Sequence, residues 1–549
     1  MDTTIFAISS GHGKAGVVVF RISGPKAFNV IDIFHISNLK IADSNQISST
    51  ELRSSKPLIE NEITTVDFGR VYLRKLFYHT SNSNINNVSK NTLSDKILID
   101  KAILLFFKAP KSFTGENCVE IHAHGSYAVM DMISKILANQ FSPAMRGEFT
   151  KRALLNGKMS LYEVEGLNDL LSAKTWSQHQ LAMTQFSGKP NQVHISWRNI
   201  LYQILAYLEV YIDFPEEDIP ENLIHLAKNL MSKLLKEFQA ALVIFNQTQK
   251  IQQGIKIALI GKPNVGKSSL INIISNRNVS IVSKISGTTR DIVESVVELD
   301  GFQINFLDTA GINIETTDKI EQIGVNLALK NLEEADIVLI ILDIVEIMAH
   351  IKANQINDAL ISSLLEIIFT KPILKRIISS PDNILFVLNK IDLVKHEDIC
   401  FVNDILNNML SLLDKTDCSI TVKQLIDITL QKNKPIHSQY KILTLTTTLQ
   451  EVNNLQKETL ENLCNEIKVL CSKLEPSEYP LLFNLRHQYH IKEAICSVSK
   501  ALNIKLTQSN LVFLIEEIRQ ASFALEIIIG RLDVEEILAK IFSEFCIGK

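Results

Sequence analysis

The chain has 549 residues, of which 46% are hydrophobic, and its 56 Lys and Arg residues against 60 Asp and Glu residues give a formal net charge of -4. At roughly 100 to 200 residues per domain, this length predicts several cores and excludes a single small module. The composition excludes a disordered chain, and the charge excludes a globally basic nucleic-acid binder, so any RNA partner must be held by a local patch.

The cysteines, the apolar runs and the first residues of the chain together indicate the cellular compartment. The seven cysteines lack C-x-x-C spacing, which favours free thiols in a reducing compartment over disulfides or a zinc site. The apolar run 102–107 has six residues, whereas a membrane span needs about 20. The first residues lack the pattern of a signal or transit peptide. We therefore expect a soluble, cytoplasmic protein that does not bind membranes.

Residues 1–150 predict an α+β domain. β-Rich runs at 17–22, 97–107 and 119–124 alternate with turn clusters, and helices are the minority. The polar stretch 81–91 has no periodicity and predicts a surface loop.

Two features of this domain resemble chemical motifs. Residues 11–16 spell G-x-G-x-x-G, but a strand-like run follows them where a dinucleotide site needs a helix, so we interpret them as a turn. His122 and His124 are expected on one face of a strand, and without a third ligand at suitable spacing we do not predict a metal site.

Helical periodicity follows in residues 151–250 and returns in 451–549. Ser160 and Glu163 form a capping box that predicts a helix start, and a long amphipathic segment ends before Pro215. Near the end of the chain, 533–542 repeats apolar residues at helical spacing. We therefore predict a helical domain split in sequence, with an α/β module at 251–450 inserted into it.

The inserted module has apolar strand-like runs at 255–260, 303–307, 337–342 and 384–388, with helical patterns between them. This alternation predicts a largely parallel sheet with crossover helices. Asp300-Gly301 lies between two β-rich runs and predicts a hairpin, which makes one edge of the sheet antiparallel.

Residues 261–268, GKPNVGKS, match the phosphate-binding pattern G-x-x-x-x-G-K-[ST]. The alternative is a chance glycine-rich turn, but the motif follows an apolar strand and precedes a helix, which is the context it requires. Backbone N–H groups and the helix N-terminus favour phosphate oxygens here. Lys267 is expected on the β- and γ-phosphates and Ser268 on Mg²⁺.

Three further motifs indicate a guanine nucleotide. Asp308 opens the sequence DTAG at a strand end, beside the expected metal, and Thr289 supplies a loop hydroxyl for Mg²⁺. Asn389 opens the sequence NKID, whose Asp392 can accept hydrogen bonds from the N1–H and N2 amine of guanine. Adenine presents the wrong edge, so the sequence predicts GTP rather than ATP.

The route of hydrolysis differs from that of Ras-like enzymes. Ile312 follows DTAG, where those enzymes have a water-orienting Gln, so another group must act. Asn264 of the phosphate loop could ligate a monovalent cation near the phosphates or could be a turn-forming side chain, and the residue pattern leaves both alternatives open.

Beyond these motifs, six segments resemble the MnmE (TrmE) family of tRNA-modification GTPases along most of the chain: 2–5, 20–24, 113–120, 146–153, 212–217 and 545–549. The resemblance implies a homodimer whose first 150 residues form a dimerisation domain that binds 5-formyl- or 5,10-methylene-tetrahydrofolate. The folate residues it implies are Arg21, Glu120, Lys158 and Lys549.

The family's activity follows from the same resemblance. With a flavoprotein of the MnmG (GidA) type, which supplies FAD, such proteins add an aminomethyl or carboxymethylaminomethyl group to C5 of the wobble uridine, U34, of certain tRNAs. Folate is the implied carbon donor.

The resemblance also assigns roles around the nucleotide. It implies K⁺ at Asn264, Ser283, Ile285 and Thr288, which favours the cation alternative for Asn264, and Mg²⁺ at Ser268 and Thr289. Glu321 would orient water, one residue further along than usual, although it could be a solvated helix charge. Catalytic roles are thus predicted for Lys267, Glu321 and Cys546, while the Cys546 thiol could also be incidental. The GTP-binding residues are Asn264, Val265, Gly266, Lys267, Ser268, Ser269, Ser283, Thr288, Thr289, Asp308, Thr309, Ala310, Gly311, Asn389, Lys390 and Asp392.

Some residues depart from the family pattern. Thr446-Thr447 replaces the Ser-Ala of the last guanine motif, and the insertions 345–381 and 396–439 are expected to be helical and without chemistry. Two rival functions remain: a ribosome-assembly GTPase without one-carbon chemistry, and a folate-dependent one-carbon enzyme in which GTP plays no part. The first is disfavoured because the chain after Leu449 lacks the G-x-x-G loop of a KH-type RNA module.

Overall fold

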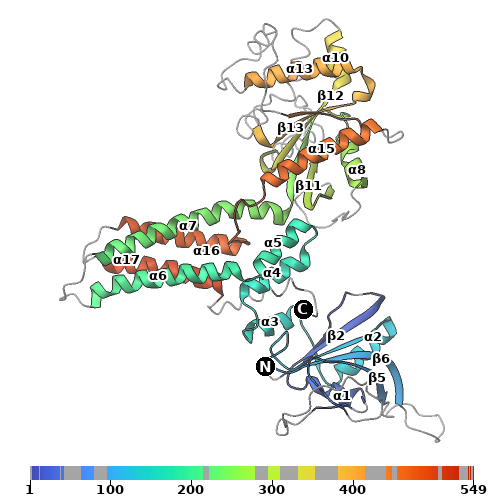
Figure 1. Ribbon diagram of the computed structural model, residues 1–549, viewed down its shortest axis with the longest axis vertical. Helices are drawn as coiled ribbons and strands as arrows, with labels where there is room; N and C mark the ends of the chain where they lie inside the picture. Colours follow the sequence, from blue (N-terminus) through green and yellow to red (C-terminus); the bar gives the residue numbers. More distant parts are fainter. Residues whose placement is uncertain are drawn as a thin grey trace, which may run out of the picture. The chain divides into compact units, whose positions relative to one another are not determined.

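A computed structural model of the protein describes most of the chain, which forms two compact units (Figure 1). Unit 1 comprises Met1–Leu171, Thr184–Met231 and Cys496–Lys549, and unit 2 comprises Ser172–Met183 and Ser232–Ile495. The predicted multidomain class, with an α+β N-terminal part, a discontinuous helical part and an α/β part, is confirmed. The described residues are 3–11, 13–36, 39–41, 64–79, 96–213, 222–277, 295–308, 332–352, 381–413, 441–447, 454–504, 510–530, 542, 545 and 548.

The N-terminal part of unit 1 is a six-stranded sheet in the order β5-β6-β7-β2-β1-β8. Its strands are β1 (Ile5–Ile8), β2 (Ala15–Ser23), β5 (Val71–His79), β6 (Lys96–Phe107), β7 (Cys118–Gly125) and β8 (Ser142–Pro143), and the short pair β3 (Leu39–Lys40) and β4 (Thr64–Thr65) forms separately. Strands β2, β6 and β7 match the three predicted β-rich runs, whereas the sequence did not predict β5. The described residues 11, 13 and 14 directly precede β2, in agreement with the turn interpretation.

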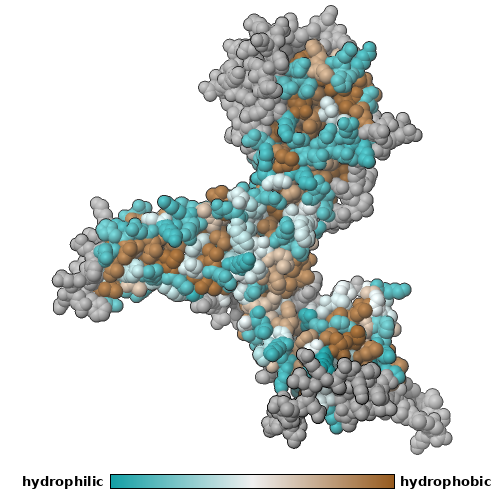
Figure 2. All heavy atoms as spheres, viewed as in Figure 1, coloured by the Kyte–Doolittle hydropathy of each residue, from teal (hydrophilic) through white to brown (hydrophobic). Residues whose placement is uncertain are grey.

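One face of this sheet is buried against helix α2 (Tyr127–Ala138) and the short α1 (Val30–Ile33). Phe20, Leu104 and Ile121, from three neighbouring strands, are fully buried with Ile133 of α2. Apolar side chains on β5 and β6 are exposed, and Figure 2 shows apolar residues at the surface of this domain. These exposed residues are Val71, Leu73, Ile97, Leu98 and Ile103.

Long helices make up the rest of unit 1 and extend into unit 2. They are α3 (Glu148–Leu155), α4 (Leu161–Ser172), α5 (Trp176–Phe186), α6 (Lys189–Asp213), α7 (Asn222–Gln253), α16 (Leu485–Asn503) and α17 (Leu511–Ile529). Helices α6 and α17 pack side by side in unit 1 (Figure 1), and Arg519 donates to Glu209 across them at 2.9 Å, 310 residues away in the sequence. The predicted helical part split in sequence is therefore observed.

The predicted capping box is confirmed atom by atom. The Ser160 backbone N–H donates to Glu163 Oε2 at 2.7 Å, and the Glu163 N–H donates to Ser160 Oγ at 3.3 Å. Both donors belong to the first turn of a helix, where no backbone acceptor is available, so the sequence S-x-x-E is sufficient to fix the start of α4.

Unit 2 contains the second six-stranded sheet, in the order β10-β11-β9-β12-β13-β14. All its pairings are parallel except β10 with β11, which the Asp300-Gly301 hairpin joins. Both turn residues have positive φ, 48° and 92°, as a type I′ turn requires. The strands are β9 (Ile255–Ile260), β10 (Ser295–Leu299), β11 (Phe302–Asp308), β12 (Ile337–Asp343), β13 (Ile384–Asn389) and β14 (Lys441–Thr444).

Helices α8 (Lys267–Arg277), α10 (Ile344–Lys352), α13 (His396–Leu413) and α15 (Asn454–Lys473) accompany this sheet. They contribute to two apolar clusters that bury the strands. Because β12 and β13 are buried along almost their whole length, their sequences are nearly continuous apolar runs. Helices α10 and α13 begin the two predicted helical insertions. Residues 353–380 and 414–439 of those insertions lie outside the described residues, as do the loop 81–91 and all of 533–542 except Phe542.

Two other expectations concern the described residues. Their cysteines, Cys118, Cys400, Cys464, Cys471 and Cys496, are free thiols, as the sequence predicted. None of the described helices combines the length and apolarity that a bilayer crossing demands.

Candidate nucleotide site and a second polar site

The phosphate-loop motif connects β9 to α8, the strand and helix that the sequence predicted around it. Asn264 and Gly266 adopt left-handed backbone conformations with φ of 63° and 102°. A Cβ on Gly266 would collide with Nδ2 of the buried Asn389. The loop therefore requires glycine here, and the close approach joins two motifs that are far apart in the sequence.

Lys267 lies at the start of α8 and is 7% exposed. Its Nζ donates to the carbonyl oxygens of Gly261 at 2.7 Å and Lys262 at 3.0 Å. These bonds fold the ammonium group back over the loop. An ammonium group beside the N-terminus of α8 makes this end of the sheet favourable for phosphate.

Asn389 fastens the guanine motif to the phosphate loop. Its Nδ2 donates to the carbonyl oxygen of Val265 at 2.6 Å and to Thr447 Oγ1 at 2.9 Å. Its Oδ1 is buried without a hydrogen-bond partner in the described part of the chain. The Asn389 side chain is fully buried, so these bonds define where the two loops meet.

Asp392 and Lys390 complete the NKID motif. Asp392 is exposed, and its Oδ1 accepts a hydrogen bond from Thr446 Oγ1 at 2.6 Å. Lys390 has a left-handed backbone with φ of 65°, and its Nζ lies 2.6 Å from Asp343 Oδ2. The Thr446-Thr447 departure thus places one hydroxyl on Asp392 and the other on Asn389, a pairing that sequence reasoning missed.

The remaining predicted nucleotide residues are only partly described. Asp308 ends β11, and its backbone pairs in register with Leu259 of β9, so the DTAG motif begins beside the strand that leads into the phosphate loop. Ser268 and Ser269 lie in the first turn of α8. The other residues of this set lie outside the described residues: Ser283, Ile285, Thr288, Thr289, Thr309, Ala310, Gly311 and Glu321.

A second polar site lies on the N-terminal sheet. Arg21 of β2 pairs in register with Glu120 of β7, and its Nε and Nη2 donate to Glu120 Oε1 at 3.0 and 2.8 Å. The guanidinium also lies over the ring of Phe113, 4.9 Å from its centroid. His122 Nε2 lies 3.2 Å from the other Glu120 oxygen. The two predicted folate residues Arg21 and Glu120 are therefore in direct contact.

The pKa of the Glu120 carboxyl is set by burial and by neighbouring charge, which act in opposite directions. Burial raises the pKa of its carboxyl, but the Arg21 guanidinium and the His122 ring outweigh that effect and lower the pKa from its ordinary 4.5. Glu120 is an anion at neutral pH. Cys118, two residues earlier, behaves differently because burial raises the pKa of its thiol to about 12, which excludes it as a thiolate at neutral pH.

A buried arginine network lies in the same domain and was missed by sequence reasoning. Arg152 is fully buried, and its guanidinium donates to the Thr3 carbonyl at 2.8 Å, to Glu116 Oε2 at 3.0 Å and to Glu148 Oε1 at 3.0 Å. Glu116 in turn accepts from Ser23 Oγ at 2.8 Å. The network joins four of the six family-like segments, those at 2–5, 20–24, 113–120 and 146–153, and gives their polar residues a structural role.

The last described residues of the chain contact the N-terminal part of unit 1. The Gly548 carbonyl accepts from Ser9 Oγ at 2.8 Å, and Phe545 is buried with Val164 and Leu167 of α4. A Cβ on Gly548, whose φ is 96°, would collide with the Ile8 carbonyl. The predicted site residues Cys546 and Lys549 lie outside the described residues.

Lys158, the remaining predicted folate residue, is exposed and follows α3. Its Cγ would lie 3.1 Å from a Cβ on Gly115, so it borders the segment that carries Glu116 and Glu120. His124 of the same sheet pairs with Asp100, Nδ1 to Oδ1, at 2.7 Å. Among the described residues, no group of His, Cys, Asp and Glu side chains is arranged to hold a metal ion.

Comparison with known proteins identifies similar sequences over the whole chain. The family model of the MnmE helical domain matches residues 161–546, and that of the GTP-binding protein TrmE N-terminus matches residues 4–158. The tRNA modification GTPase MnmE of Rickettsia prowazekii is 34% identical over 549 residues, and that of Rickettsia typhi is 32% identical over 548 residues. Each alignment covers 100% of both chains.

Proposed function

The chain belongs to the MnmE (TrmE) family of tRNA-modification GTPases, and from that premise we propose that it hydrolyses GTP to drive modification of the wobble uridine, U34, of certain tRNAs. With an FAD-dependent flavoprotein of the MnmG type, the product is a C5 aminomethyl or carboxymethylaminomethyl group. The geometry around Asn389 is the observation that carries the GTPase assignment.

Guanine recognition is supported by the way the NKID residues are held. Asn389 ties this motif to the phosphate loop, and Asp392 remains exposed while Thr446 orients its carboxylate. A carboxylate in this position accepts from the N1–H and N2 amine of guanine. Adenine offers an acceptor at N1 and no amine at C2, so it leaves the carboxylate unpaired and is rejected.

Lys267, Ser268 and the loop N–H groups are proposed to hold the phosphates, with Ser268 and Thr289 as ligands of Mg²⁺. Ser268 is exposed at the N-terminus of α8, as a ligand to a phosphate-bound cation must be. Asn264 is also exposed at a left-handed turn of the loop, which suits a shared K⁺ site with Ser283, Ile285 and Thr288. These cations supply positive charge beside the transferred phosphoryl group, and Glu321 is proposed to orient water.

The Arg21–Glu120 pair is proposed to bind 5-formyl- or 5,10-methylene-tetrahydrofolate together with Lys158 and Lys549. The anionic Glu120 can accept from the N–H groups of a pterin ring, in the way that Asp392 accepts from guanine. Arg21 and Lys158 provide cations for the ligand's carboxylates. Cys546, in the same closing segment as Lys549, is proposed as a catalytic thiol.

The assembly we propose is a homodimer that binds the flavoprotein and tRNA in the cytoplasm. The exposed apolar residues Val71, Leu73, Leu98 and Ile103 on β5 and β6 support dimerisation through the N-terminal sheet, because contact with a second copy would remove their side chains from water. The five free cysteines of the described residues support a reducing compartment.

Nucleoside mass spectrometry of tRNA from cells with and without this chain tests the proposal. Loss of the C5 modification at U34 is the expected result, and restoration by the wild-type chain but not by an Asp392→Asn chain would assign the effect to the guanine site. Normal modification in its absence would favour the ribosome-assembly alternative, which ribosome profiles of the same strains would reveal.

A further inference from the structure

Two acidic residues outside every nucleotide motif contact lysines inside them. Asp343 Oδ2 lies 2.6 Å from Nζ of Lys390 in NKID, and Glu346 Oε1 lies 2.8 Å from Nζ of Lys262 in the phosphate loop. Asp343 ends β12, and Glu346 lies in the first turn of α10, where the first insertion begins. The start of this insertion therefore touches both halves of the nucleotide site.

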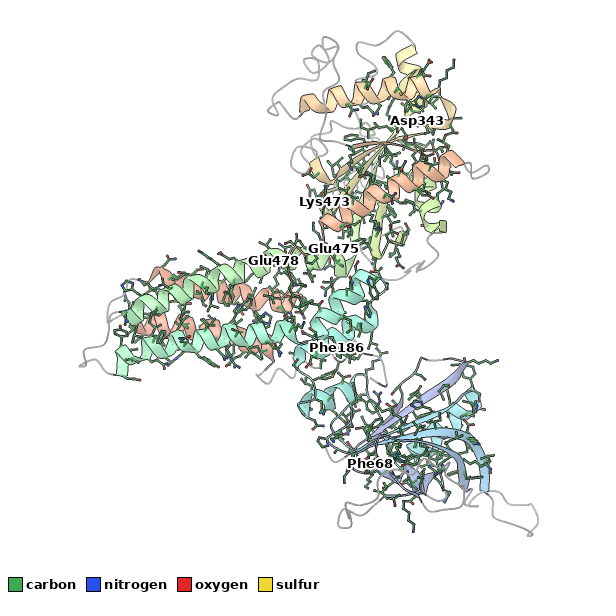
Figure 3. All side chains as sticks on the ribbon, viewed as in Figure 1. Phe68, Phe186, Asp343, Lys473, Glu475 and Glu478 are labelled. Carbon is green, nitrogen blue, oxygen red and sulfur yellow. The ribbon has the colours of Figure 1, made fainter. Side chains whose placement is uncertain are left out.

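Of the two acidic residues, Asp343 is the better placed to act on the NKID motif. It pairs in register with Asn389 across β12 and β13. Lys390, the residue that Asp343 binds, comes directly after Asn389 in the chain. Its Oδ1 accepts the Val345 backbone N–H at 2.9 Å, which fixes the carboxylate and leaves Oδ2 for Lys390. The Asp343 side chain is 14% exposed and that of Lys390 is 30% exposed, so water screens the pair only in part. Figure 3 labels Asp343 in this unit.

The ion pair acts on a strained part of the backbone. Lys390 has φ of 65°, a conformation that residues with a Cβ rarely adopt and that persists only where neighbours hold it. No side chain caps the short 3₁₀ turn that follows, Ile391–Leu393. This turn carries Asp392, while Asn389 on the other side of Lys390 is fastened to Val265. Lys390 thus sets the geometry between the two guanine-motif residues.

We propose that Asp343 is a positioning residue for guanine recognition. By holding Lys390, it keeps Asn389 on the phosphate loop and Asp392 facing the base at the same time. This inference rests on the proposed GTPase function and deepens it. Because Asp343 acts on the loop that holds the base, its loss should speed nucleotide release and leave hydrolysis at saturating GTP little changed.

The test uses Asp343→Asn in the full-length chain. The amide oxygen can still accept from the Val345 N–H, so the start of α10 is kept while the charge facing Lys390 is removed. Glu397→Gln is the matched control, since Glu397 is an exposed acid on the neighbouring helix α13 and loses the same charge. We expect fluorescent GDP to dissociate about tenfold faster from Asp343→Asn, with kcat within about twofold of wild type and the control unchanged.

A double-mutant cycle with Lys390→Gln separates positioning from a general loss of structure. In the Lys390→Gln background, Asp343→Asn should add no further acceleration of GDP release. An unchanged release rate in the single variant, or an equal acceleration in both backgrounds, would overturn the proposal. If Asp343→Asn melts at a lower temperature than the control, Asp343→Ser, which also retains a capping oxygen, is assessed by the same cycle.

The proposed function is checked separately on the wild-type chain by titration with GTP and ATP. A wild-type chain without preference for GTP would refute the GTPase assignment. A wild-type chain that prefers GTP, combined with an Asp343→Asn variant that releases GDP normally, would refute only the role of Asp343.

Discussion

Asp392→Asn provides the sharpest test of guanine recognition. The substitution keeps an oxygen for the Thr446 hydroxyl, so the fold of the loop should survive. It places an amide donor opposite the guanine N2 amine, and it removes the negative charge that strengthened the hydrogen bonds to both the N1–H and the N2 amine. Each such bond contributes about 1.5–3 kcal/mol, and because Asp392 is exposed to water we take the lower figure for both.

The sum is about 3 kcal/mol, which corresponds to roughly 150-fold weaker binding of GTP. Xanthosine triphosphate carries an oxygen where guanine has the N2 amine, so the Asn amide can donate to it while accepting from N1–H. We therefore expect a switch of preference from GTP to xanthosine triphosphate, measured by competition against a fluorescent guanine nucleotide. Glu397→Gln should bind GTP normally. GTP affinity that stays within threefold of wild type in Asp392→Asn would refute the proposed contact with the base.

Four further changes have defined outcomes. Gly266→Ala adds a Cβ at φ of 102° against Asn389, so we expect at least about 2 kcal/mol of strain and loss of GTP binding by calorimetry; retained binding would contradict the geometry. Arg152→Met removes the buried cation that binds Glu116, whose side chain is 13% exposed, and should lower the free energy of unfolding in urea by about 3 kcal/mol, whereas Lys151→Met, at an exposed residue, should not. The folded-state pKa of Glu120 is depressed, so the stability that its charge contributes is present above pH 4.5 and is lost as the pH falls through the lowered pKa. Glu120→Gln should therefore be less stable than wild type at pH 7 but equally stable at a pH below the lowered pKa. A stability difference that does not change with pH would exclude the charge pair as the cause. Glu321→Ala should slow K⁺-stimulated hydrolysis about 100-fold and leave GTP binding intact, and unchanged turnover would remove Glu321 from the mechanism.

Local chemistry made much of the fold predictable from the sequence. The capping box at Ser160, the Asp300-Gly301 hairpin and the strand before the phosphate loop each depend on residues close in the chain, and each is observed. The same holds for Asn389 and Asp392, because their motif fixes their place at the end of a parallel strand.

Contacts between distant residues were not predictable in this way. Arg152 binds Glu116 and Thr3, which lie 36 and 149 residues away, and no periodicity links such positions. In the sequence, Asp343 is only an acidic residue at the end of an apolar strand. Its contact with Lys390 depends on the register between β12 and β13, which the sequence does not reveal. Thr446-Thr447 is a departure from the Ser-Ala motif when residue types alone are compared. That comparison does not reveal that the two hydroxyl groups bind the side chains of Asp392 and Asn389.

These distant contacts explain how the site is ready for its ligand. Each polar side chain of NKID is already held by a neighbour: Asn389 by Val265 and Thr447, Lys390 by Asp343, and Asp392 by Thr446. A loop that is ordered before binding loses less conformational entropy when the nucleotide arrives, so more of the interaction energy is expressed as affinity. Substitution of a neighbour should therefore weaken nucleotide affinity at nearly constant fold stability. The motif residues confer recognition, and the residues that bind them confer its strength.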